Sequence, residues 1–416
     1  MTALTRAIPS SAIPSSAVQS SAVQSPAAFE HSRLGSRQHS DGGWGLVPIK
    51  ARANRFASFD VSDFEPVNGL EIEWKHTPLP KVRPLIDGAL DGGRYEFEAT
   101  VSAGGSVDWI DRTDARIGTA GKPEERASAN AWSSFEAALA ITVSGEEPVQ
   151  VTVSRSGLGG QARAAHTLIV AEKHSRGLVI LQNSGPAMLS ENVEIVIEDG
   201  AHLTVVTVQE WDDDAVHLAC HFCAVGRDSR FRHVAVNLGG SLVRLNPTAH
   251  LAGTGGEVEL FGVYFADAGQ HLEQQVFVDH DAAHTRSRVS YKGALQGAGA
   301  RTVWVGDVLI RPTGSGTDSY EQNRNLLLTD GARADSIPNL EIETGDIVGA
   351  GHASASGRFD DEQLFYLESR GIPEEEARRL VVQGFLSEIV QKIGVPELES
   401  RLQGVIETEL RTVEVA

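Results

Sequence analysis

The sequence is poor in cysteine and in basic residues, and it lacks long apolar runs. Two cysteines among 416 residues cannot build a disulfide framework, and they cannot supply the four thiolates of an iron–sulfur cluster held by one chain. No stretch approaches the roughly 18 apolar residues of a membrane-spanning helix. With 36 Lys and Arg against 56 Asp and Glu, the formal charge of −20 repels a phosphate backbone. We therefore expect a cytoplasmic protein that binds neither nucleic acid nor a membrane.

Common catalytic motifs are also missing from the sequence. It contains no GxxxxGK[ST] phosphate loop, no GxSxG nucleophile turn, no HExxH pair and no GxGxxG between a strand and a helix. The chain therefore does not look like an NTPase, a hydrolase or a dehydrogenase.

The first 41 residues differ in composition from the rest. Ala7 to Pro26 reads as four pentapeptides, AIPSS AIPSS AVQSS AVQSP, and no acidic residue precedes Glu30. Such a segment cannot bury enough apolar surface to fold, so residues 1–41 are predicted to be a disordered tail. An organelle transit peptide is the weaker alternative, because the segment lacks the arginine density of such signals.

Residues 42–145 are mixed in character and are predicted to form short helices and turns. From 146 to 357 the pattern changes to β-branched runs separated by Gly, Asp and Asn, which predict strands. These runs follow one another every 10 to 16 residues or so with no amphipathic helix between them, which excludes a doubly wound sheet. A β-sandwich and a solenoid remain, and the unbroken series of strands favours a parallel β-helix.

Residues 358–416 follow the helical period. Pro373 and three glutamates suit the start of a helix, and Gly394-Val-Pro396 separates it from the next. The resulting hairpin has apolar faces that include Phe385, Ile389, Leu398 and Leu402. Its acidic outward face suggests either a basic protein partner or a solvated cover over the end of the solenoid.

Histidine and cysteine offer the first candidates for chemistry. Eight of the 14 histidines lie between His202 and His284, which suggests a metal site. Strand alternation, however, places His217, His221 and Cys223 on one face and Cys220 on the other. Two buried structural thiols are therefore favoured over a zinc or redox pair. The segment around Asp279 and His284 reads as a polar strand end more readily than as a cation site.

His352 stands apart from this group. It lies among the small residues of Gly349-Ala-Gly-His-Ala-Ser-Ala-Ser-Gly357, where the strand region meets the helices. Small neighbours leave an imidazole accessible, although a structural histidine with hydrogen bonds explains the position equally simply.

Several longer motifs resemble one known family. These motifs are Asn54-Arg-Phe56, Trp74-Lys-His-Thr-Pro-Leu79, Ser290-Tyr-Lys-Gly293, Asn323-Arg-Asn-Leu-Leu-Leu328, Ala334 to Ile342, and His352 leading into Asp361 to Ile372. Together they resemble the SufB/SufD scaffold proteins of the SUF system for iron–sulfur cluster assembly. Asn323 occupies the approximate position of a cysteine found in SufB-like chains, and Gly351 and Ala353 replace glutamates beside the histidine. The resemblance is therefore closest to the SufD branch.

The resemblance implies a fold and a set of partners. The fold is a right-handed parallel β-helix between an N-terminal helical region and a C-terminal helical domain. The function is that of a scaffold without catalysis of its own, paired with a SufB-like paralogue and bound through its C-terminal helices to the ABC-type ATPase SufC. Whether the isolated chain forms a homodimer stays open, and some family complexes suggest an associated reduced flavin.

The resemblance also assigns site residues. His352 matches a histidine that faces the SufB cysteine, where transient iron or a nascent cluster is held, while Ala350 replaces a cysteine present in some relatives. Phe385, Ile389, Leu398 and Leu402 are predicted to contact the ATPase, and closure of the ATPase is predicted to open the β-helix interface. Two rival functions are a β-helix lyase or hydrolase and a histidine-rich metal-storage or sensor protein.

Overall fold

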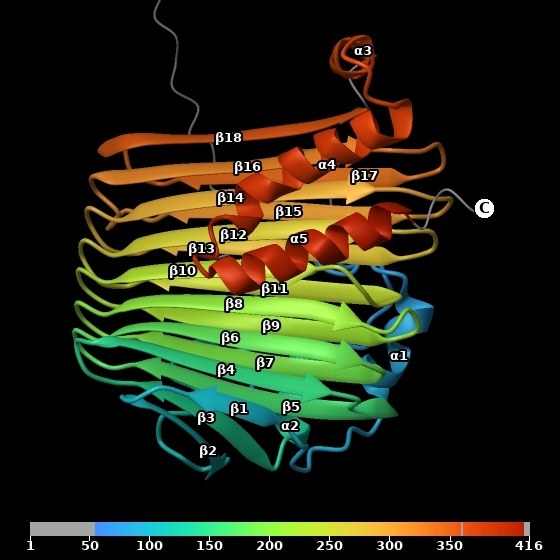
Figure 1. Ribbon diagram of the computed structural model, residues 1–416. Helices are drawn as coiled ribbons and strands as arrows, with labels where there is room; N and C mark the ends of the chain where they lie inside the picture. The colour runs from blue at the N-terminus through green and yellow to red at the C-terminus, as the bar shows by residue number, and fades with distance from the viewer. Residues whose placement is uncertain (1–54, 359–360, 412–416) are drawn as a thin grey trace, which may run out of the picture. The chain divides into compact units, whose positions relative to one another are not determined.

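The computed structural model describes residues 55–358 and 361–411. The tail predicted for residues 1–41 lies outside the described residues. The fold class predicted from the sequence is confirmed, since the chain is mainly β and forms a parallel β-solenoid of about 8 turns with helices at its C-terminus (Figure 1).

The region before the solenoid holds helices and strands. The 3-10 helix η2 (Val61–Asp63) and the helices α1 (Leu79–Asp87) and α2 (Arg126–Ser134) alternate with β1 (Glu98–Val101), β2 (Gly105–Asp111) and β3 (Ala137–Val143). The three strands join the solenoid: β1 pairs antiparallel with β4, β2 pairs antiparallel with β3, and β3 pairs parallel with β5. Sequence reading predicted helices and turns here, and it missed that this region starts both sheets.

Fifteen further strands build the solenoid. They are β4 (Pro148–Ser156), β5 (Gly159–Ala171), β6 (Arg176–Gly185), β7 (Ala187–Ile197), β8 (His202–Trp211), β9 (Val216–Val225), β10 (Arg230–Asn237), β11 (Leu242–Leu251), β12 (Glu257–Ala266), β13 (His271–His280), β14 (Arg286–Leu295), β15 (Arg301–Ile310), β16 (Thr317–Leu327), β17 (Arg333–Ile342) and β18 (Ile347–Arg358).

Each turn of the solenoid contributes one strand to each of two sheets. Sheet A runs β17-β15-β13-β11-β9-β7-β5-β3-β2, and sheet B runs β1-β4-β6-β8-β10-β12-β14-β16-β18. From β3 and β4 onward the neighbours pair in parallel, which needs a connection that returns to the same end of the sheet. Here the strand of the opposite sheet provides that connection, so no crossover helix is needed.

The space between the sheets is filled by a mainly apolar core that contains one row of polar side chains. Leu, Ile and Val side chains of both sheets form the main apolar cluster. One row of polar side chains, here called the polar row, runs in register through sheet B. It consists of Arg155, Asn183, Gln209, Asn237, Tyr264, Asn325 and Ser356, with Gly293 between Tyr264 and Asn325.

Hydrogen bonds link members of the polar row from one coil to the next. Arg155 Nε donates to Asn183 Oδ1 at 2.8 Å, and Asn183 Nδ2 donates to Gln209 Oε1 at 3.0 Å. Further along, the Tyr264 hydroxyl donates to Asn325 Oδ1 at 2.6 Å across the gap at Gly293. Because a buried polar group is costly unless it is bonded, these contacts favour one register of the coils over its alternatives.

The C-terminal helices are α3 (Asp361–Ser369), α4 (Glu374–Val390) and α5 (Pro396–Arg411). Of these, α4 and α5 pack on the outer face of sheet B. Apolar side chains of α4 and α5 pack on outward residues of β6, β8, β10, β12 and β14, among them Ile180, Val206, Val234, Phe261 and Ala294. Figure 1 shows both helices running obliquely in front of sheet B, with α4 nearer β14 and α5 nearer β10.

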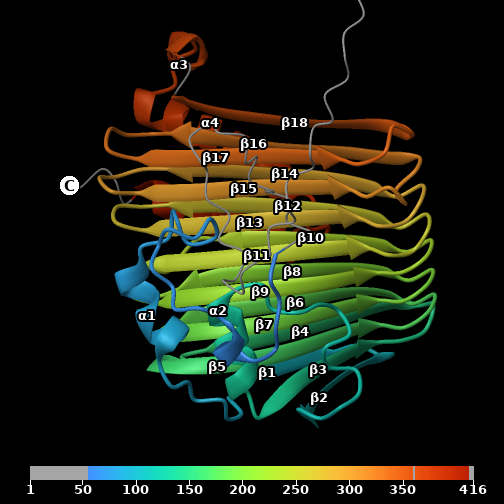
Figure 2. The same ribbon diagram turned by 180° about the vertical axis from the view of Figure 1, so that it is seen from behind.

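The N-terminal helices cover sheet A instead (Figure 2). Val82, Leu85 and Ile86 of α1 pack against Val216, Leu218 and Leu242. A buried ionic group joins the two layers: Arg244 contacts Glu125 at 2.6 Å and Glu273 at 3.1 Å, and Thr77 donates to Glu273. The solenoid is therefore covered by different helices on its two outer faces.

A substitution at Gly293 measures how tightly the polar row is packed. A Cβ atom at this position would lie 1.8 Å from Cε2 of Tyr264, whose ring fills the space above the glycine. We expect Gly293→Ala to cost about 1–3 kcal/mol through overpacking, measured by urea unfolding. Gly384→Ala is the control: it lies in α4 with nothing within 4 Å of the added Cβ, so it should not destabilise. Equal stability of both variants would contradict the packing described here.

Candidate functional site

His352 lies on the last strand of sheet B. Strand β18 pairs with β16 on one side only, and β17 is the last strand of sheet A in the same way. We call these two strands the open end. From His352 to Arg358 every residue of β18 is exposed, and no other strand of the described residues pairs with the outer edge of β17 or β18. Such an edge is a template for pairing with another chain.

The register of β18 determines which way His352 points. Its Cα pairs with that of Glu321 in β16, two residues from the pair formed by Asn323 and Ser354. Residues paired in parallel strands point to the same face of the sheet. Because Glu321 and Asn323 are buried between the sheets, His352 lies on the inward face, above the interior of the solenoid. The hydrogen bond from Asn325 Nδ2 to Ser356 Oγ, 3.2 Å long, confirms this orientation for the row.

Glu321 is a buried carboxyl on the strand next to β18, in register with His352. Only 1% of the residue is exposed, and neither carboxyl oxygen has a hydrogen-bond partner among the described residues. Burial raises the pKa of Glu321 to about 8, and the charge of Asp307 adds to the effect. At neutral pH the group is therefore mainly protonated. Gly306 provides the room it needs, since a Cβ there would lie 2.5 Å from Glu321 Oε2.

Sequence reading missed Glu321. The signal was present, because Ser319, Glu321, Asn323 and Asn325 alternate with Tyr320, Gln322 and Arg324, and the first set is buried. An alternating row of polar residues was not expected to face the interior, since strand patterns are normally read as apolar inside and polar outside. Asn323 itself is buried and donates from Nδ2 to the Tyr264 hydroxyl at 2.8 Å.

Small residues leave the surroundings of His352 open. A Cβ added at Gly349 or Gly357 would meet nothing within 4 Å, and one at Gly351 would lie 3.5 Å from the Tyr320 ring. A second polypeptide can therefore approach the backbone of β18 closely.

Among the described residues, the other histidines and cysteines do not form a metal site. Cys220 and Cys223 are both buried and free, and burial raises the pKa of each thiol. Cys223 belongs to the interior cluster and Cys220 packs outside sheet A beneath Trp132, as the strand alternation predicted. Within residues 55–358 and 361–411, no group of three His, Cys, Asp or Glu side chains is placed to hold a metal ion.

The buried histidines have protein partners instead. His217 Nε2 lies 2.8 Å from Glu191, which also binds Arg155. Burial by itself raises the pKa of Glu191, but Arg155 and His217 outweigh it and hold that pKa well below its usual value. His221 and His233 contact each other at 3.0 Å, and burial lowers the pKa of both. These imidazoles form part of the core.

The segment around Asp279 forms ion pairs within the protein. Arg311 donates to both Asp279 oxygens, at 2.7 and 2.8 Å, and His250 Nδ1 lies 3.0 Å from Oδ2. Both oxygens of the Asp279 carboxylate therefore have partners within the protein, which agrees with the polar strand end favoured from the sequence.

The prediction for the helical hairpin needs a correction. Ile389, Leu398 and Leu402 are 1%, 6% and 0% exposed, and with the partly buried Phe385 they pack against sheet B. These four side chains hold the hairpin on its own solenoid and are not available to an ATPase. The exposed apolar side chains of this region are others: Phe365 and Tyr366 of α3, 71% and 57% exposed, and Leu380 of α4 at 41%.

Comparison with known proteins identifies the family. A family model described as "SUF system FeS cluster assembly, SufBD core domain" matches residues 152–385. An iron–sulfur cluster assembly SufBD family protein of Mycobacterium bovis is 50% identical over 373 residues, covering 86% of this chain and 93% of the relative. A protein of Mycobacterium leprae with the same description is 47% identical over 369 residues, or 86% and 94% of the two chains.

A more distant relative is named for the SufD branch. The iron–sulfur cluster assembly protein SufD of Bacillus subtilis is 29% identical over 254 residues, covering 59% of this chain and 57% of the relative. The chain belongs to the SufBD family of the SUF system for iron–sulfur cluster assembly, as the motifs in its sequence predicted.

The raised pKa of Glu321 predicts a pH-dependent stability. The folded-state pKa of about 8 lies above the unfolded value of about 4, so its contribution is full below pH 4 and is lost as the pH rises toward 8. The free energy of unfolding of Glu321→Gln should therefore rise relative to that of the wild type by on the order of 1 kcal/mol per pH unit between pH 4 and 8. Urea unfolding of both proteins at several pH values measures the difference, and a difference independent of pH would contradict a protonated Glu321.

Proposed function

We propose that this chain is a SufD-type scaffold subunit of a cytoplasmic SufBCD complex, without catalysis of its own. In this proposal it pairs with a SufB-like paralogue, binds a SufC-like ATPase and helps to hold iron or a nascent cluster as cargo. Membership of the SufBD family supports the proposal. The observation that carries it is the exposure of His352 on an unpaired edge strand. No helix of the described residues is long and apolar enough to cross a bilayer.

The open end suits pairing with a second solenoid. Strands β17 and β18 end their sheets together, so two edges of one molecule face the same direction (Figure 1). Each edge can extend its sheet by hydrogen bonding to a partner strand, and the small side chains of β18 allow close approach. The same edges offer a route to a homodimer when the isolated chain has no paralogue to bind.

His352 supplies one ligand to the proposed cargo site. A single imidazole does not hold iron by itself, so the remaining ligands must come from the partner, and a thiolate from a SufB-like chain suits iron or a cluster. The buried Glu321 below it is uncharged at neutral pH and leaves the imidazole as the donor on the inward face. The proposal includes a reduced flavin as an associate of the complex, supported by the family resemblance alone.

The proposed ATPase contact lies on the outer surface of the C-terminal helices. Phe365 and Tyr366 are exposed aromatic side chains on α3, a helix of nine residues, and Leu380 of α4 is exposed as well. Aromatic side chains exposed at a surface commonly anchor protein interfaces. Movement of a bound ATPase would then reach the solenoid through α4 and α5, which pack on it.

Removal of the imidazole tests the cargo site. His352→Ala should leave the complex assembled, because the side chain is exposed. The iron and acid-labile sulfide content of the purified complex should fall. Ser354→Ala, on the same face of the same strand, is the control and should retain the wild-type content. Normal content in His352→Ala would rule out a ligand role for this histidine.

Two kinds of substitution separate docking from folding in the C-terminal helices. Phe365→Ser combined with Tyr366→Ser should release the ATPase in a pull-down without lowering the melting temperature. Leu402→Ala should instead lower the stability of the hairpin, by about 2–5 kcal/mol for a leucine in a packed core. ATPase retained by the double variant would move the contact to another surface.

A further inference from the structure

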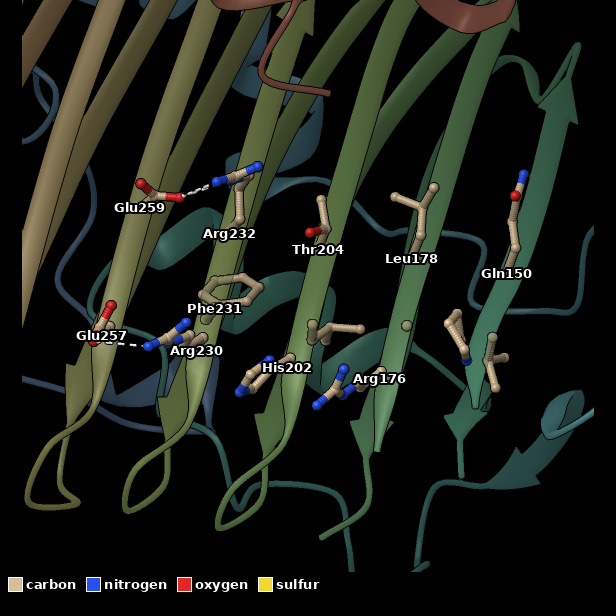
Figure 3. A pocket seen from close by; sticks show the side chains of 14 residues that line it. Gln150, Arg176, Leu178, His202, Thr204, Arg230, Phe231, Arg232, Glu257 and Glu259 are labelled. Carbon is tan, nitrogen blue, oxygen red and sulfur yellow. Dashed lines mark hydrogen bonds and ion pairs between the residues drawn. The ribbon is translucent and has the colours of Figure 1, made fainter. Parts of the chain in front are cut away.

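An open groove of about 610 Å³ lies on the part of sheet B that the helices leave uncovered. It follows the first residues of β4, β6, β8, β10 and β12 (Figure 3). Along these strands the outward residues change character midway: Arg230 and Arg232 of β10 face the groove, whereas Val234 and Val236 lie under α4 and α5. The turn between these helices borders the groove, since Arg232 Nη1 donates to the backbone oxygen of Lys392 at 3.3 Å.

Three basic side chains stand in register across this groove. Arg176 of β6 pairs with His202 of β8, which pairs with Arg230 of β10. Neighbouring strands are about 4.8 Å apart, so these three residues, here called the cationic row, span roughly 10 Å. Figure 3 shows the three side chains side by side on one face.

The cationic row is incompletely neutralised. Within the part of the chain that the structure describes, Arg176 makes no ion pair, and the His202 ring has no hydrogen-bond partner. Arg230 Nη2 lies 3.6 Å from Glu257 Oε1, a loose contact, and its side chain is 64% exposed. In a chain with a formal charge of −20, two arginines without a close acidic partner on one groove are unusual.

Two other outward arginines of this sheet have close acidic partners. Arg232 pairs with Glu259 and Arg288 with Asp318 through short contacts. Arg286 of β14, in the same outward row as Arg230, sits between Glu257 and Asp318 at 4.0 and 3.7 Å. Among the described arginines that line the groove, Arg232 thus has a close acidic partner, whereas Arg176 and Arg230 do not.

We propose that this groove binds a phosphate-bearing small molecule, with the phosphate group over His202 between Arg176 and Arg230. Guanidinium groups match phosphate oxygens with two parallel hydrogen bonds each. The next outward row, Gln150, Leu178 and Thr204, lies beside the phosphate position and offers one apolar and two polar side chains to the rest of the ligand. This site is independent of the proposed scaffold function.

The dimensions favour a small ligand over an acidic protein segment. The volume falls within the range of about 300–1,000 Å³ that is usual for small-molecule sites. Pro148 on β4 and Glu257 on β12 bound the cationic row, so a longer acidic peptide would leave it after three strands and meet a carboxylate. A phosphate or diphosphate fits within the roughly 10 Å available.

Titration calorimetry with pyrophosphate at constant ionic strength is the primary test. Arg176→Gln and Arg230→Gln should each weaken binding by about tenfold or more, the usual loss for a charge-assisted hydrogen bond. Arg286→Gln is the matched control, since it removes an arginine of the same outward row that does not line the groove. No binding by the wild type, or equal weakening by all three substitutions, would overturn the proposal.

Two further ligands identify what is bound. An affinity for ADP equal to or higher than that for pyrophosphate would support the site. A higher affinity would also show that the nucleoside part of ADP contributes contacts beside Leu178 and Thr204. An octaglutamate peptide that binds more tightly than either phosphate ligand would overturn the proposal in favour of an acidic protein partner.

The pH dependence gives a readout specific to His202. Burial lowers the pKa of its imidazole, Arg230 and Arg176 lower it further, and Glu257 acts in the opposite direction. Of the remaining charged groups in the groove, Arg232 and Glu259 neutralise each other. An anion above the ring favours its protonated form, so affinity should rise as the pH falls.

Sulfate is the probe for this measurement, because its charge does not change near neutral pH. Its affinity for the wild type should increase severalfold between pH 8 and about 6, near the ordinary histidine pKa. The dependence should disappear in His202→Gln, which keeps a polar side chain in the same place. A dependence retained by His202→Gln would remove His202 from the site.

Discussion

The in-register stacking of polar side chains inside the solenoid is the constraint on which the other features depend. A β-solenoid with an entirely apolar interior can slide by two residues without exposing a polar group, because its inner face repeats with period two. Here Arg155, Asn183 and Gln209 bind one another from coil to coil, and Tyr264 reaches Asn325 across Gly293. A shift of register would leave these groups buried and unbonded. The polar row thus sets the position of every residue on the outer faces, including the cationic row.

The same constraint explains the chemistry of the open end. The polar row ends at Ser356 on a strand with no further coil above it, and Glu321 lies one coil below with neither oxygen bonded among the described residues. Interior groups that a further coil would cover are exposed there, beside His352. The end of the stack is therefore the place where backbone edges, a free imidazole and a buried acid occur together, which supports its proposed use as the contact to a second subunit.

The sequence was sufficient to predict the strands, the parallel solenoid and the C-terminal helices, since each depends on a short periodic pattern. It also predicted correctly that Cys220 and Cys223 face opposite sides, because alternation needs only the strand itself. The failures concern relations between distant segments. The apolar faces of the hairpin were recognised, but Leu402 and Ile389 were assigned to a partner protein when sheet B of the same chain covers them. An apolar stripe shows that a surface is buried and does not show what buries it.

Glu321 and the strands β1 to β3 were missed for a related reason. Glu321 is significant only through its register with His352, which depends on the length of the intervening coil and on the bulge between Thr317 and Asp318. The first strands join the sheets through antiparallel pairing of β1 with β4 and of β2 with β3. Their own residues are mixed in character and do not form a pattern that predicts a strand. Tertiary contacts determine which strands pair in this way, and a local sequence pattern does not predict them.

The position of α4 and α5 across several coils has a mechanical consequence. Their apolar residues contact β6, β8, β10, β12 and β14 together, and hydrogen bonds from Lys292 and Gln296 to the backbone of the hairpin tie it to the last of these strands. A load applied to the helices is therefore shared by five stacked strands in shear. Separating them would require breaking continuous ladders of backbone hydrogen bonds at once, so sheet B resists such a load as a unit.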